Sequence, residues 1–110
     1  MDRFPAGHLV IGLVPEELVA GGTAHPYLEL LTRLLARLVS NGLYALAASG
    51  KSGRLEIHCV FEREIDARRF AEAVSASIIV RLPGWKSQRE FLLDRNAVRM
   101  IERILQGGRR

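Results

Sequence analysis

The sequence predicts an α+β fold: a ferredoxin-like, split β-α-β-β-α-β sandwich with a four-stranded antiparallel sheet and an additional C-terminal helix. Three observations predict it: short β-rich runs bounded by Gly and Pro, longer segments with apolar residues three and four apart, and a polar loop bracketed by glycines. A length of 110 residues suits a single domain with its own core. Its expected parts are a lead-in (1–7), the βαββαβ core (8–82), an amphipathic helix (87–106) and a frayed tail (107–110).

The first half of the core begins with a predicted strand over His8–Val14, which lies between Gly7 and Pro15. The following PEELVAGG is expected to form a connector with one helical turn. Leucines spaced three and four apart predict a helix over about 23–40, which starts either at Thr23 or at His25-Pro26. Asn-Gly after this segment is a typical helix stop.

Two further predicted strands, at 43–48 and 54–62, flank the loop SGKSG. This loop contains GKS, the end of the phosphate-binding motif GxxxxGK[ST]. The complete motif needs a glycine five residues before Gly50, and that position is Ala45. The loop is therefore interpreted as a hairpin connection and not as a nucleotide site, although a weak anion contact of its basic residues stays open.

The second half repeats the pattern. Asp66 is the expected N-cap of a helix that continues to about Ala76. A strand is predicted over Ser77–Leu82 and ends at Pro83-Gly84. The last predicted element is an amphipathic helix over Ser87–Gln106, with its apolar residues on one side.

One face of this sheet is expected to be free of helices. Clean alternation in 54–62 places Ile57, Cys59 and Phe61 toward the helices and the polar set on the free face. For the first strand, the expectation is Leu9, Ile11 and Leu13 inward, with His8, Val10, Gly12 and Val14 on the free face. The candidate ligand or interface face therefore contains His8, Glu56, His58, Glu62 and Arg81.

This face allows more than one function. Histidine beside carboxylates can transfer protons, but alternating polar residues are also what solubility requires of a half-exposed sheet. The valines and glycine among them favour a flat, partly apolar surface that packs in a homodimer. No aromatic residue is expected on the free face of the central strands, which disfavours base stacking as in an RNA-recognition motif.

Basic residues are concentrated near the C-terminus. The chain has a net charge of +4, and residues 81–110 carry eight basic and three acidic residues, a net of +5. Arg95, Arg99 and Arg103 recur every four residues as one helical ridge, with Arg89 near it. Such a ridge can follow phosphates without reading sequence, but a solvated helix face is the favoured interpretation.

No cofactor or metal is predicted. His8, His25 and His58 lie on different elements, and the chain has neither CxxC nor HxxxH. The single cysteine, Cys59, cannot form an internal disulfide, which fits a reducing compartment. Because Pro15 interrupts the apolar N-terminal run and no run approaches 18 residues, we expect a cytoplasmic protein without a membrane segment.

The expected function is a small, non-catalytic interaction or regulatory domain that forms a homo-oligomer, most simply a dimer. One alternative is sequence-nonspecific nucleic-acid binding through the basic C-terminal helix. A second alternative is a small dimeric enzyme or ligand-binding domain that uses the free sheet face.

Overall fold

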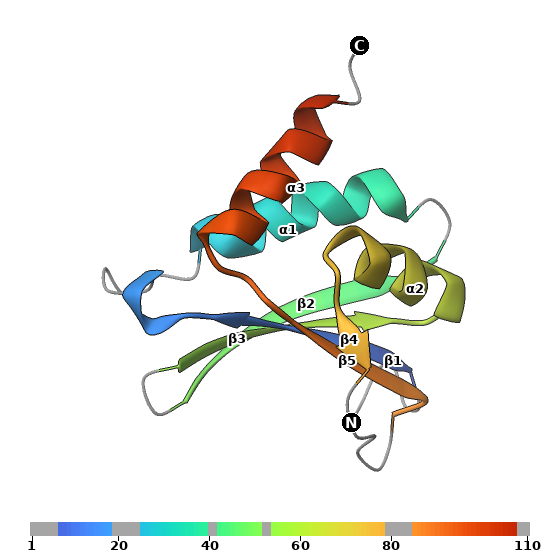
Figure 1. Ribbon diagram of the computed structural model, residues 1–110. Coiled ribbons are helices and arrows are strands. Elements are labelled where there is room, and N and C mark those ends of the chain that lie inside the picture. Colours follow the sequence, from blue (N-terminus) through green and yellow to red (C-terminus); the bar gives the residue numbers. More distant parts are fainter. Residues whose placement is uncertain (1–6, 19–24, 40–41, 52–53, 79–84, 108–110) are drawn as a thin grey trace.

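The computed structural model describes residues 7–18, 25–39, 42–51, 54–78 and 85–107 and has an α+β fold. Its elements are β1 (His8–Val14), the 3-10 turn η1 (Glu16–Leu18), α1 (His25–Leu38), β2 (Tyr44–Lys51), β3 (Arg54–Phe61), α2 (Glu64–Ala73), β4 (Ser77–Ile78), β5 (Ser87–Leu92) and α3 (Arg95–Gly107). The three α-helices described all lie on one side of the sheet (Figure 1). Within the described ranges, no helix combines the length and the apolar character needed to cross a membrane.

The sheet has four main strands in the order β2-β3-β1-β5, and the two-residue β4 pairs with the outer side of β5. The pairs β2–β3, β3–β1 and β5–β4 are antiparallel, whereas β1 and β5 are parallel, so the sheet is mixed. β1 and β3 lie inside the sheet, as predicted. The ferredoxin-like order is not confirmed, because β5 separates β1 from β4.

The difference arises at residues 87–92, which were predicted to begin the last helix. They form β5 instead, and α3 begins only at Arg95. The carboxylate of Asp94 accepts a hydrogen bond from the backbone N–H of Ala97 at 2.9 Å and so caps the helix. The apolar helical spacing therefore starts after Asp94 and does not extend back through SQREFL. The strand predicted over 77–82 is seen at Ser77–Ile78, and its remaining residues lie outside the described ranges.

The core lies between the sheet and the helices. Ile57, Cys59 and Phe61 of β3 are fully buried there, which confirms the predicted alternation of this strand. Phe70 of α2 contacts two strands through its ring, with centroid distances of 5.5 Å to Phe61 and 6.0 Å to Phe91 of β5. These three rings join β3, α2 and β5 in one apolar cluster.

The facing predicted for β1 is wrong. Val10 pairs with Cys59 and Gly12 with Ile57, so His8, Val10, Gly12 and Val14 face the helices, and Leu9, Ile11 and Leu13 face the other way. Both alternate sets in HLVIGLV are largely apolar, so alternation alone does not choose between them. The register is consistent with packing at Gly12, where an added Cβ would lie 2.9 Å from the Cζ of Phe91.

The helix boundaries shift modestly from those predicted. α1 begins at His25, which was the second of its two predicted starts. α2 begins at Glu64, so Asp66 lies inside its first turn and is not the N-cap. The residue at the N-cap is Arg63, in an extended conformation without a side-chain cap, and the buried carboxylate of Asp66 lies directly against Gly42. A side chain at position 42 would collide with it.

α3 crosses α1 on the helix side of the sheet, and no described helix covers the opposite face (Figure 1). Its Ala97 and Ile101 are buried, and the Arg37 side chain of α1 donates a hydrogen bond to the Leu105 carbonyl at 2.8 Å. β2 and β3 form the predicted hairpin, in which β2 continues to Lys51, and the two connecting residues lie outside the described ranges.

Candidate functional site

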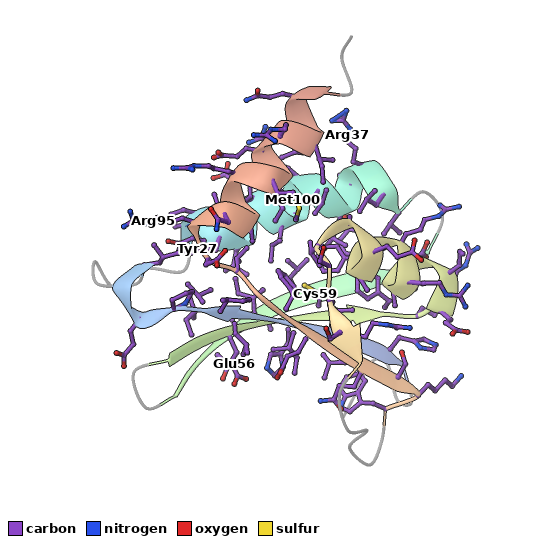
Figure 2. All side chains as sticks on the ribbon, viewed as in Figure 1. Tyr27, Arg37, Glu56, Cys59, Arg95 and Met100 are labelled. Carbon is purple, nitrogen blue, oxygen red and sulfur yellow. The ribbon has the colours of Figure 1, made fainter. Side chains whose placement is uncertain are left out.

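The candidate site is the outer face, which we define as the side of the sheet opposite the helices. Figure 2 shows Glu56 pointing away from the helices and Cys59 pointing toward them. The pairing registers place nine residues of β1, β2 and β3 whose side chains are described on this face: Leu9, Ile11, Leu13, Ala45, Ala47, Ser49, Glu56, His58 and Val60.

Glu56 and His58 form the one predicted pair that the structure brings together. Their Oε1 and Nε2 atoms lie 3.0 Å apart, and each side chain is about one third exposed, at 32% and 36%. A carboxylate and an imidazole at this distance can exchange a proton. Glu62 follows the end of β3 and is exposed, six residues from Glu56, which is about 20 Å along an extended chain. Arg81 lies outside the described residues.

His8 does not belong to the outer face, contrary to the prediction. It lies on the helix side of β1, where its Nδ1 is 2.8 Å from the Oγ of Ser87 on β5. Burial is the main cause that lowers the pKa of His8 below its ordinary value of 6.5. The prediction missed Ser87 as a partner because residue 87 was assigned to a helix, and the parallel pairing of β1 with β5 has no local sequence signal.

The centre and the edge of the outer face differ in accessibility. Leu9 and Ile11 of the inner strand β1 are only 3% and 8% exposed. β2 is the last strand of the sheet on its side, and its Ala45 and Ala47 are exposed. Among β1, β2 and β3, the most accessible part of the outer face therefore lies over β2 and has small side chains, whereas on β5 the larger Leu92 is 55% exposed.

The basic residues of α3 form an exposed ridge, as predicted. Arg95, Arg99 and Arg103 are exposed and make no ion pair with another residue in the described part of the chain. Arg89 is not part of this ridge, because it lies on β5 and is partly buried on the helix side of the sheet.

A shallow groove of about 240 Å³ lies between α1 and α3. Tyr27, Leu30 and Arg33 of α1 line it, together with Val98 of α3 and the carboxylates of Glu29 and Glu102. Ligand pockets usually enclose about 300–1,000 Å³. The small size and the two carboxylates make this groove a poor site for an anionic ligand.

The remaining titratable side chains offer little chemistry. Burial raises the pKa of the Cys59 thiol to about 12, so the thiol is un-ionised and unsuited to nucleophilic attack. No three or more His, Cys, Asp or Glu side chains gather as a possible metal site in the described ranges. No protein-family model matches the sequence, and no curated protein or solved structure is significantly similar to it.

Proposed function

We propose that this protein is a non-catalytic interaction domain that forms a homodimer through β2. The observation that carries the proposal is the character of this edge strand: it has eight residues, and Ala45, Ala47, Ala48, Ser49 and Gly50 are all exposed. Edge strands are usually protected from pairing by charges, proline, bulges or short length. β2 has no proline, and its first charged residue is Lys51 at its end.

A second copy of the same strand is the partner that fits best. Two β2 strands related by a two-fold axis run antiparallel, so each pairs its outward N–H and C=O groups with those of the other. The alanines around position 47 leave room for close approach of the two backbones. Such a dimer uses each exposed edge once and therefore closes without forming a filament.

Sedimentation velocity with a charged variant tests this proposal. We expect a dimer for the unmodified chain, and at least a ~10-fold weaker dimer for Ala47→Lys, because two lysines then meet across the two-fold axis. Ala36→Lys, on an exposed position of α1, is the matched control and should remain dimeric. A monomeric unmodified protein at about 100 μM would contradict the proposal.

Ala48→Lys separates edge pairing from packing of the outer faces. Ala48 pairs with Ile57 and so lies on the helix side of β2, yet it is exposed. Edge pairing predicts that this variant weakens the dimer as Ala47→Lys does. A dimer sensitive only to Ala47→Lys would indicate stacking of two outer faces instead.

Polyanion binding by α3 is a second candidate function, supported by Arg95, Arg99 and Arg103, which are exposed and have no ion-pair partner among the described residues. Fluorescence anisotropy with labelled duplex DNA at several salt concentrations tests it. If each arginine neutralises one phosphate, replacing Arg95 and Arg99 by Gln should lower the salt slope by about 2. The matched control replaces Arg33 and Arg69, which are exposed on α1 and α2. An equal loss in both double variants would indicate general charge attraction and not a ridge.

A further inference from the structure

A polar cluster lies on the helix side of the sheet, where β1 and β5 both begin. His8 and Ser87 are direct partners in the parallel register, and His8 Nδ1 lies 2.8 Å from Ser87 Oγ. Arg89 is two residues further along β5, so its side chain lies on the same face as that of Ser87. Three polar side chains therefore share one corner on the helix side of the sheet.

The guanidinium of Arg89 is incompletely satisfied. Its Nη1 atom is buried and has no hydrogen-bond partner within the described ranges. A guanidinium stays protonated in proteins and has only donor groups, so a buried Nη1 needs an acceptor. An acceptor with negative charge suits it best, because charge-assisted hydrogen bonds are the strongest available to arginine.

The charges around this corner are unbalanced. Lys86 and Arg89 both act to lower the pKa of His8, and Glu64 at the start of α2 acts to raise it. The carboxylate of Glu64 already pairs with Arg68 at 3.2 Å. Two cationic side chains, Lys86 and Arg89, thus act on His8 against one carboxylate that already has a cationic partner. This excess of positive charge at a partly buried position attracts an anion.

We propose that His8, Ser87 and Arg89, with Lys86 beside them, bind a small oxyanion of the phosphate type, either free or as part of a larger ligand. Arginine, lysine and hydroxyl groups offer donors on separate side chains, which suits the several oxygens of phosphate better than the two of a carboxylate. This site is independent of the proposed dimer, since β5 and β2 are separated by β1 and β3.

His8 couples this site to pH. A protonated imidazole donates from Nδ1 to Ser87 Oγ, which leaves the hydroxyl proton of Ser87 to point at the anion. The bound anion in turn offsets the effect of Lys86 and Arg89 on the imidazolium. An oxyanion of constant charge therefore binds more tightly at pH 6 than at pH 7.5, and among the described residues Glu64 is the carboxylate that acts on His8 in the same direction as the anion.

The test is a titration of the full ¹⁵N-labelled chain with inorganic phosphate, followed by NMR at constant ionic strength. We expect saturable shifts at residues 7–9 and 86–89. A parallel titration with sulfate, whose charge is constant over this range, should show binding that is at least ~3-fold tighter at pH 6 than at pH 7.5. Arg89→Gln should weaken binding by about 10-fold or more, because it removes a charge-assisted donor. Arg33→Gln removes the same charge from an exposed position of α1 and should leave binding unchanged.

Two milder variants keep the test decisive if Arg89→Gln does not fold. Ser87→Ala and Lys86→Gln should each weaken phosphate binding by about 3-fold or more. No saturable shift up to about 100 mM phosphate, or shifts confined to α3, would overturn the site. Equal affinity for acetate and phosphate would overturn the assignment of the anion class, and a sulfate affinity independent of pH would overturn the role of His8.

Discussion

The two faces of the sheet are built from the same strands and yet bury their side chains in different ways. On the helix side, Val10, Ile57 and Phe61 are fully buried by side chains of α1, α2 and β5. On the outer face, Leu9 is nearly as buried at the centre, but Ala47 on β2 is exposed. Burial on the helix side thus comes from a packed second layer, whereas the outer face is open at the edge strand β2.

This difference indicates where stability and association reside. Removing side-chain atoms on the helix side leaves a cavity between the sheet and the helices, because the two layers relax only partially around it. On an open face, solvent fills the gap instead. We therefore expect the helix side to control unfolding. The edge of the outer face is expected to control contacts with a second chain.

The largest expected effect comes from adjacent residues on opposite faces of β3. Phe61→Ala removes a fully buried ring that contacts Phe70 at 5.5 Å and should cost about 3–5 kcal/mol of the free energy of unfolding. Val60→Ala, on the outer face, should cost less than about 1.5 kcal/mol. Urea unfolding followed by circular dichroism measures both. Similar losses for the two variants would show that the two faces are equally packed.

Cys59 reports on the same layer without any mutation. Because burial raises its pKa from 9.0 to about 12, the thiolate fraction at pH 8 is about 10³-fold lower than for an ordinary thiol. Alkylation by iodoacetamide should be slower by at least this factor in the folded protein than in denaturant, as measured by mass spectrometry. A folded protein that reacts at the rate of the unfolded chain would mean that the helices do not seal this face.

The sequence predicts these two faces unequally, and particular residues show why. β3 alternates polar and apolar residues, so the burial of Ile57 and Cys59 follows from the pattern. β1 has largely apolar residues on both of its faces. Its orientation is determined only by its register with β3 and by the close approach of Phe91 to Gly12. β5 has polar residues on both faces, so its sequence pattern does not identify it as a strand. One of them, Ser87, contacts His8 of β1, which is far away along the chain.

The candidate sites follow the same division. The Glu56–His58 pair and the arginine ridge of α3 were predictable, since strand and helix spacing place residues two or four apart on one side. The corner at His8, Ser87 and Arg89 was not, because 79 positions separate His8 from Ser87. The local sequence signal that separates β5 from α3 is Asp94. Its carboxylate accepts a hydrogen bond from the backbone N–H of Ala97 at 2.9 Å and so caps the helix.

A glycine substitution in β1 tests how tightly the helix side is packed. Gly12→Ala places a Cβ 2.9 Å from the Cζ of Phe91, whose ring is held by Phe70, and should cost about 1–3 kcal/mol by overpacking. Gly107→Ala is the control, since a Cβ there meets no atom within 4 Å. Thermal unfolding should show a lower midpoint for the first variant and no loss for the second. An unchanged midpoint for Gly12→Ala would mean that the ring of Phe91 moves without cost.

His8, a polar group on the helix side, gives the smallest expected effect. Because its pKa is lowered mainly by burial, the unfolded chain binds a proton more readily than the folded protein. The stability contributed by a neutral His8 is therefore complete above about pH 6.5 and is lost as the pH falls through the lowered pKa of the folded state. Glu64 acts in the opposite direction and keeps this loss small.

Urea unfolding between pH 7.5 and 5 measures this loss, with His8→Gln and His58→Gln compared. The slope of stability against pH should become shallower in the first variant, while the contribution of His8 persists in the second, whose histidine lies on the outer face. Saturating phosphate at constant ionic strength should also reduce the slope in the unmodified protein, because an anion beside Arg89 stabilises the imidazolium. If His8→Gln leaves the slope unchanged, then His8 is not held neutral by the helical layer, and the helix side must admit water at the start of β1.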